Sequence, residues 1–227
     1  MCFSATASFT AAAVIGSVGV VTLRSAAAKP DHRILALAAF PVLFALQQVT
    51  EGLLWLDLAS PEPGALRGVL VHAFQGYAEV FWPAFAPLAV LLIEQKRWHR
   101  ILISVCLVIG VALSVYLLVA MIGHPYQASV GEGHIVYRND FHYPTGIEVP
   151  YVVATTLSLL LSSERDVQRL GLVIVFGFAV AYVSFHHAYI SVWCFFAAIA
   201  SVLVYLYVRT VSARGVLEAS RLTPSPE

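Results

Sequence analysis

Apolar segments long enough to cross a lipid bilayer recur along this sequence. An α-helix needs about 20 consecutive apolar residues to cross the hydrocarbon core. We assign seven such spans, at residues 4–23, 34–56, 68–93, 101–122, 147–163, 170–187 and 189–208. Only 11% of the residues are charged, against about 25% in a typical soluble domain. The sequence therefore predicts an all-α fold: a polytopic membrane bundle of seven transmembrane helices.

We expect the seven spans to form one domain, residues 1–211. The last two spans nearly touch, which requires a tight turn at residues 187–190. Gly16 and Gly19 lie among other small residues in the first span, and small residues allow close helix packing in lipid. This predicts a first helix at the centre of the bundle. Residues 212–227 are expected to form a disordered cytoplasmic tail.

The Lys and Arg residues are distributed unevenly between the two sets of connecting segments. Arg67 and Arg138 lie on the side that includes the N-terminus. The other eleven of the thirteen lie on the opposite side, at Arg24, Lys29, Arg33, Lys96, Arg97, Arg100, Arg165, Arg169, Arg209, Arg214 and Arg221. Segments rich in Lys and Arg stay in the cytoplasm. The predicted orientation therefore has the N-terminus outside and the C-terminus in the cytoplasm.

One long connection, residues 123–146, is predicted to lie outside the cell. Residues 128–137 within it have the pattern of a hairpin that turns at Gly131-Glu132-Gly133. A loop of this length either forms a lid over a binding site or is a solvated connector. Pro41, Pro83 and Pro87 lie inside spans, where each proline frees a carbonyl group that another group must satisfy.

Two neighbouring spans carry amide, imidazole and carboxylate side chains at depths where such groups are costly. These residues are Gln47, Gln48 and Glu51 in the second span and His72, Gln75 and Glu79 in the third. Residues three or four positions apart share one side of a helix, so each span presents a polar stripe. With the orientation above, almost all ionisable groups within spans fall in the outer half of the bilayer. The sequence thus predicts a polar pocket that opens to the outside.

Histidine, cysteine and carboxylate side chains are the ligands that zinc and related divalent transition metals prefer. The candidate ligands are Glu51, His72, Glu79, His186, His187 and Cys194. A metal with an open coordination position activates water for hydrolysis, and Glu79 or Glu51 would then be the catalytic base. The amides of Gln47, Gln48 and Gln75 would bind the cofactor or the substrate, an unidentified small molecule or lipid.

Other interpretations of the same residues remain open. Glu51 and Glu79 could serve a proton-coupled transporter or a solute sensor, or the polar groups could only join helices by hydrogen bonds. A haem protein would use His72 with His186 or His187 as axial ligands. Retinal is excluded because the only lysines, Lys29 and Lys96, lie in predicted cytoplasmic segments. The net charge of zero gives no indication of nucleic-acid binding.

Three stretches carry a family resemblance: residues 1–9 (MCFSATASF), residues 47–52 (QQVTEG) followed by Trp55, and residues 193–198 (WCFFAA). They resemble an uncharacterised family of bacterial seven-span membrane proteins, over most of the chain up to Val208. The resemblance implies a protein of the bacterial inner (plasma) membrane, and no activity. It also implies that Cys2 joins the metal site, where removal of Met1 would free its amino group; otherwise Cys2 is a small apolar interface residue.

Overall fold

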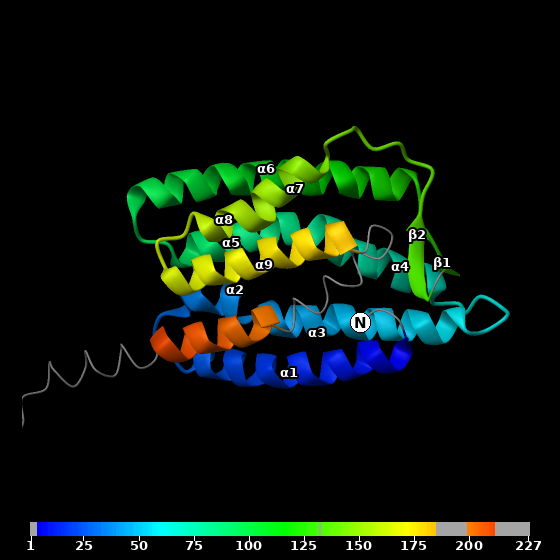
Figure 1. Cartoon of the computed structure of the whole chain (residues 1–227), viewed down its shortest axis with the longest axis horizontal. Helices are drawn as coiled ribbons and strands as arrows, with labels where there is room; N and C mark the ends of the chain where they lie inside the picture. The colour runs from blue at the N-terminus through cyan, green and yellow to red at the C-terminus, as the bar shows by residue number, and fades with distance from the viewer. Residues whose placement is uncertain (1–3, 132, 185–198, 212–227) are drawn as a thin grey trace, which may run out of the picture.

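The computed structural model describes residues 4–131, 133–184 and 199–211. These residues form an elongated bundle whose helices run roughly along its long axis (Figure 1). The first half of the chain forms α1 (Ala5–Ala27), η1 (His32–Ile34), α2 (Leu35–Ala38), α3 (Phe40–Leu58), α4 (Arg67–Gln75), the π-helical turn η2 (Gly76–Phe81), α5 (Trp82–Ile93) and α6 (Arg97–Gly123). The rest forms β1 (Gln127–Gly131), β2 (His134–Arg138), α7 (Glu148–Val152), the π-helical turn η3 (Val153–Leu157), α8 (Ser158–Leu160), α9 (Arg165–Ser184) and a helix at Ile199–Val211.

Four helices among the described residues are long and apolar enough to cross a membrane. They are Ala5–Ala27, His32–Leu58, Arg67–Ile93 and Arg97–Gly123. They correspond to the first four predicted spans. The segments Glu148–Leu160 and Ile199–Val211 are apolar but shorter, and α9 has 20 residues. The predicted turn at residues 187–190 lies outside the described residues, and the total of seven spans remains a prediction.

The first helix packs tightly against α3 through its small residues. A Cβ atom added at Gly19 would lie 2.8 Å from the backbone nitrogen of Val42, so only glycine allows this approach. The opposite side of α1 is open, with Val14 at 58% and Val20 at 45% exposure. The expected central position of this helix is therefore wrong. Its small residues create one close helix contact, while its apolar outer face is suited to lipid.

The third membrane-length helix contains the π turn η2, and the local sequence explains how this turn is satisfied. The Trp82 N–H bonds to the Tyr77 carbonyl, five residues back. The next bond in this pattern would need an N–H from Pro83, which proline lacks. The Ala78 carbonyl instead accepts a hydrogen bond from the Tyr151 hydroxyl at 2.7 Å. Tyr151, in α7, thereby links α7 to this helix. The prediction that another group must satisfy a carbonyl freed by proline is confirmed at Ala78.

Pro87 leaves the Pro83 carbonyl without an N–H donor from four residues ahead. This carbonyl is directed at Gly110 of α6, where an added Cβ atom would lie only 1.9 Å from its oxygen. The absence of a side chain at Gly110 thus allows α5 and α6 to approach at this point.

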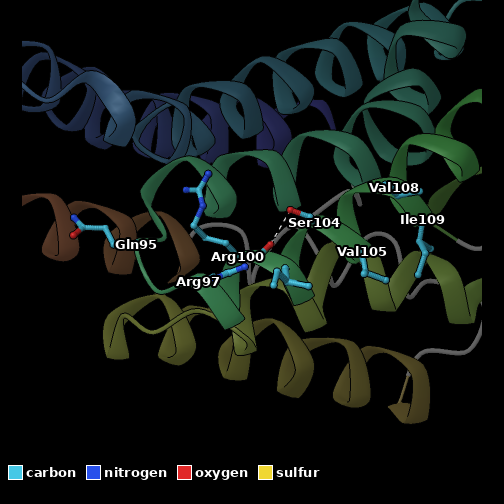
Figure 2. A pocket seen from close by; sticks show the side chains of 8 residues that line it. Gln95, Arg97, Arg100, Ser104, Val105, Val108 and Ile109 are labelled. Carbon is cyan, nitrogen blue, oxygen red and sulfur yellow. Dashed lines mark hydrogen bonds between the residues drawn. The ribbon is translucent and has the colours of Figure 1, made fainter.

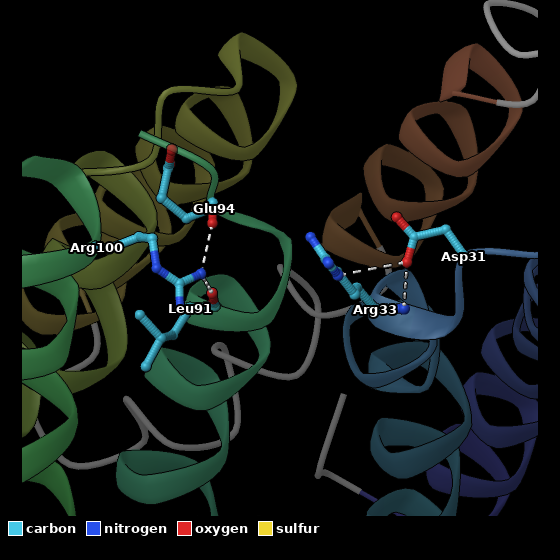
Figure 3. A network of polar contacts seen from close by, with 5 residues as sticks. All are labelled: Asp31, Arg33, Leu91, Glu94 and Arg100. Carbon is cyan, nitrogen blue, oxygen red and sulfur yellow. Dashed lines mark hydrogen bonds and ion pairs between the residues drawn. The ribbon is translucent and has the colours of Figure 1, made fainter. Parts of the chain in front are cut away.

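A buried carboxylate holds together two turns at one end of the bundle. Glu94, only 1% exposed, accepts hydrogen bonds from the Ser163 N–H (2.6 Å) and hydroxyl (2.7 Å). It also accepts from the N–H groups of Gln95 and Lys96. Nη1 of Arg100 donates to the Glu94 carbonyl at 2.8 Å and to the Leu91 carbonyl at 3.2 Å (Figure 3). These contacts satisfy polar groups at the α5–α6 turn.

The opposite end of the bundle is covered by the hairpin cap, which we define as residues 124–144. Its strands pair antiparallel with Gly131 opposite His134, as predicted, so the described part of the chain adds a β-hairpin to the expected helices. Tyr137 stacks on Phe74 of α4, with ring centroids 5.0 Å apart and planes 6° apart. A hydrogen bond of 2.8 Å from His124 lowers the pKa of the exposed Asp140 carboxyl below its usual range. The described part of the cap therefore packs on α4 through Tyr137.

Candidate functional site

Glu79 lies in the π turn η2 and is the centre of a hydrogen-bonded group. The Tyr126 hydroxyl lies 2.9 Å from each carboxylate oxygen of Glu79. Nε2 of Gln75 donates to one of these oxygens at 3.3 Å, as expected for residues four apart on a helix. Within the described part of the chain, no Lys, Arg or His forms an ion pair with Glu79. Among the described residues, the donors to this carboxylate are therefore neutral groups.

The donors continue from Tyr126 into the hairpin cap. The hydroxyls of Tyr126 and Tyr143 are 2.5 Å apart, and Nδ2 of Asn139 donates to Tyr143 at 2.9 Å. Burial and then the negative charge of Glu79 raise the pKa of the Tyr126 phenol, so Tyr126 stays protonated and donates to Glu79. Tyr143 must therefore donate to Tyr126, which gives one consistent direction from Asn139 to the carboxylate.

Gln75 leaves an unused acceptor beside the carboxylate. Its side chain is buried at 2% exposure, and its amide nitrogen donates to Glu79, an orientation that suits an ionised carboxylate. The amide oxygen Oε1 then has no hydrogen-bond partner among the described residues. An unsatisfied buried acceptor costs about 1–3 kcal/mol. Glu79 and Gln75 together present acceptor atoms suited to a molecule that carries N–H or O–H donors or a positive charge.

The local backbone adds to the case for a site at Glu79. π turns are rare in helices and occur frequently at functional sites. Here η2 contains Glu79 itself, and the neighbouring η3 follows Tyr151, whose hydroxyl bonds to the η2 carbonyl of Ala78. The site therefore lies on one irregular helix segment, η2, which α7 contacts through Tyr151 and the hairpin cap contacts through Tyr126.

The other predicted site residues of the second and third spans have different partners. Gln47 accepts a hydrogen bond from the Trp82 indole nitrogen at 3.0 Å. Glu51, 1% exposed, accepts from the Ser8 hydroxyl at 3.4 Å, on the side facing α1. Nδ1 of His72 lies 2.7 Å from the Gly68 carbonyl of its own helix. The structure thus brings Gln75 and Glu79 together by a hydrogen bond, and gives Glu51 and His72 other partners.

The predicted metal ligands fall into two groups. Cys2, His186, His187 and Cys194 lie outside the described residues. Within the described ranges, no three His, Cys, Asp or Glu side chains gather as a metal site requires. Gln48, which was predicted to bind the cofactor or the substrate, is buried, with 2% exposure. The metal hypothesis therefore depends on the four undescribed residues and remains a prediction.

Sequence reasoning did not connect the hairpin cap with Glu79. Tyr126 lies in the long loop, 47 positions from Glu79, and bonds directly to its carboxylate. Tyr143 and Asn139, from the same loop, extend the hydrogen bonds beyond Tyr126. Helical periodicity indicates partners only within one helix. Side-chain chemistry could have indicated the link between this loop and Glu79. A carboxylate inside a span needs hydrogen-bond donors, and a tyrosine-rich loop supplies them at the same end of the bundle.

Apolar helices of membrane-spanning length that enclose a polar site are characteristic of a helical membrane protein. Within this class, the chain belongs to one family: the model of the Family of unknown function (DUF6629) matches residues 1–219. This agrees with the resemblance to an uncharacterised family. No curated protein and no solved structure matches the chain.

Proposed function

We propose that this chain is a seven-span protein of the bacterial inner membrane that binds a small cationic or proton-donating solute from the outside. The binding site is the carboxylate of Glu79 with the amide of Gln75, closed by the hairpin cap. The protein acts as a solute sensor or as a proton-coupled transporter. The observation that carries this proposal is a carboxylate inside an apolar helix with neutral donors as its described partners.

The distribution of charge supports the proposed orientation. We call one end of the bundle the basic end, because it carries Arg24, Lys29, Arg33, Lys96, Arg97, Arg100, Arg165, Arg169 and Arg209. The chain turns from α1 to α2, from α5 to α6 and from α8 to α9 at this end, and the hairpin cap lies at the other (Figure 1). Positively charged ends face the cytoplasm, which leaves Glu79 and the cap on the outer side.

The chemistry of the site favours a cationic solute. A carboxylate in the interior of a membrane protein requires compensation by a positive charge, a proton or several donors. Tyr126 supplies one O–H and Gln75 one N–H group, while Gln75 Oε1 has no partner among the described residues. A proton, an ammonium group or a metal ion would complete the charge balance, and an ammonium group would also satisfy the unused amide oxygen.

The hairpin cap would act as the lid of this site. Tyr126 contacts Glu79 directly and Tyr143 holds Tyr126, so displacement of the cap removes the O–H donor from the carboxylate. A solute that binds Glu79 competes with Tyr126 for the same oxygens. Binding and cap position would therefore be coupled, because a hydrogen bond made to the solute replaces one made to the cap.

The test is a ligand-dependent thermal shift on the purified protein in detergent. The probes are ammonium, methylammonium, Na⁺ and Zn²⁺ chlorides, with choline chloride at equal ionic strength as the reference. We expect a saturable rise in unfolding temperature with at least one probe. Glu79→Gln should weaken the apparent affinity at least tenfold, since a hydrogen bond to a charged group contributes about 1.5–3 kcal/mol.

Glu148→Gln is the matched control, because Glu148 is an exposed carboxylate at the first position of α7. It should keep the response of the unmodified protein. The proposal fails if no probe gives a saturable shift, or if Glu79→Gln folds normally and responds as well as the control. Tyr126→Phe adds a second readout: removing the competing hydroxyl should strengthen probe binding if the cap acts as a lid.

A metal-dependent hydrolase is the second candidate, and the burial of Glu51 in α3 favours it. In this case Glu51 and Glu79 would join Cys2, His72, His186, His187 and Cys194 around zinc or another divalent metal. Elemental analysis of the purified protein should then find about one metal per chain, with the amount reduced in Glu51→Gln. The absorption spectrum of the same sample tests for haem. A metal-free protein that still responds to ammonium would favour the sensor or transporter.

A further inference from the structure

A groove of about 640 Å³ runs along α6 from the basic end of the bundle. It is lined by Gln95, Arg97, Arg100, Ile101, Ser104, Val105, Val108 and Ile109 (Figure 2). From Arg97 onward these residues recur every three or four positions, so they form one stripe along the helix. The stripe changes in character along its length: it begins with two guanidinium groups and continues with valine and isoleucine side chains.

The charged part of the groove is available to a ligand. Arg97 is exposed and makes no hydrogen bond or ion pair with any residue that the structure describes. Arg100 uses Nη1 to bond two carbonyls of the α5–α6 turn, and its other two nitrogens make no bond to described residues (Figure 3). By contrast, Arg33 at the same end is accompanied by Asp31, 3.8 Å away. Among the described residues, neither Arg97 nor Arg100 forms an ion pair with a carboxylate.

The apolar part of the groove is suited to a lipid acyl chain in its length and in its exposed side chains. Trp98, 75% exposed, follows Arg97, and tryptophan is enriched at the boundary between membrane and water. Residues 97–108 span about 16 Å along the helix axis at ~1.5 Å per residue. Val105 and Val108 are 54% and 69% exposed, on a helix of membrane-spanning length. With Trp98 at the membrane–water boundary, the groove would extend from the level of the lipid head groups into the hydrocarbon.

We infer that this groove binds an anionic phospholipid, with its phosphate group at Arg97 and Arg100 and one acyl chain along Val105 and Val108. Basic groups at the end of a membrane helix attract anionic head groups, and arginine is well suited to phosphate because its guanidinium donates two parallel hydrogen bonds. A free anion would use only the two arginines and leave the valine stripe unoccupied. The site is independent of the one at Glu79, which lies towards the hairpin cap.

The experiment compares lipid retention by native mass spectrometry after reconstitution in equal amounts of phosphatidylglycerol and phosphatidylcholine with identical acyl chains. We expect the protein to retain phosphatidylglycerol preferentially. Arg97→Gln should reduce this retention about fivefold, the effect of one basic residue at a membrane surface. Arg97 is the residue of choice because it has no described protein partner. Val108→Trp, which fills an exposed part of the groove, should reduce retention without removing any charge.

Arg33→Gln is the matched control: it removes a positive charge from the same end of the bundle, away from the groove, and should leave retention unchanged. The inference is overturned if the two lipids are retained equally, or if Arg97→Gln and Arg33→Gln have the same effect. It is also overturned if inorganic phosphate displaces the lipid while Val108→Trp has no effect. That result would identify a small-anion site at the arginines alone.

Discussion

Among single residues, Glu94 shows how a carboxylate can be stabilised without a cation. Burial by itself would raise the pKa of this side chain, but hydrogen bonds from Ser163, Lys96 and Gln95 outweigh that effect and lower it. The acceptor atoms of one side chain thus satisfy two turns that are almost 70 residues apart in sequence. Because all these donors stabilise the ionised form, the contribution of Glu94 to stability depends on pH.

The folded protein holds the pKa of Glu94 below its usual value of 4.5. Its stabilising effect is therefore complete above that pH and is lost as the pH falls through the lowered pKa. Glu94→Gln should reduce the free energy of unfolding by about 2 kcal/mol at pH 7, and by less in acid. The measurement is thermal unfolding in detergent as a function of pH. Glu62→Gln, at an exposed position, should have little effect, and a pH-independent loss in Glu94→Gln would contradict this account.

At this scale the sequence predicted pairs that a helix brings together and missed those that a loop brings together. Gln75 and Glu79 are four positions apart, and the expected contact is present. Tyr126 and Glu79 meet only because the hairpin cap folds back on α4, which helical spacing cannot indicate. Glu94 was not identified because its donors are backbone and hydroxyl groups of a distant turn, and such donors have no sequence pattern.

Among the helices, α5 and α6 meet through their backbones. The Pro83 carbonyl, which has no N–H donor at Pro87, is directed at Gly110. A side chain at this position of α6 would collide with main-chain atoms, which cannot rotate away as a flexible side chain can. The packing of the two helices therefore depends on one glycine and two prolines.

Gly110→Ala should lower the free energy of unfolding by about 1–3 kcal/mol, the usual cost of an added group in a packed interior. The control in the same helix is Gly123→Ala, since a Cβ atom there meets nothing within 4 Å. Alanine is the better helix former, so this control should be neutral or slightly stabilising. Unfolding of both variants in detergent provides the comparison. Equal stability of the two would show that α6 can move away from α5 at no cost.

Hydropathy predicted where the helices begin and end, but not the irregular turns within them. The first four spans were predicted within a few residues, because burial in lipid requires long apolar segments. The π turns were not predicted, since one additional residue within a uniformly apolar helix leaves no mark on hydropathy. The prolines gave a partial signal: Pro83 predicted a freed carbonyl, and the structure identifies Tyr151 as its donor.

For the whole molecule, the two ends of the bundle differ in charge and in structure. One end carries most of the Lys and Arg residues, and the other carries the hairpin cap. This polarity was readable in the sequence because positively charged segments recur after every second span. The position of α1 was predicted wrongly, because small residues indicate that a helix has a close neighbour but not how many neighbours it has.

The proposed orientation predicts which loops an impermeant thiol reagent reaches in intact cells. In a variant without the three native cysteines, Ser60→Cys and Gln127→Cys should be labelled from outside, because both positions are exposed near the cap end. Gln95→Cys, at the basic end, should be labelled only after permeabilisation. Labelling of Gln95→Cys in intact cells would reverse the orientation and with it the outward access proposed for Glu79.

The π turn Gly76–Phe81 also affects how relatives should be aligned with this chain. A π turn is an α-helix that has accommodated one additional residue. A relative that lacks one residue here would keep both flanking helix segments facing the same neighbours, simply by forming regular α-helix. An alignment that forbids gaps inside membrane helices would instead pair every residue after Phe81 with a neighbour of its true counterpart. Neighbouring residues of a helix point in directions that differ by about 100°. Single-residue gaps at this position are therefore to be allowed when Glu79 is compared across the family.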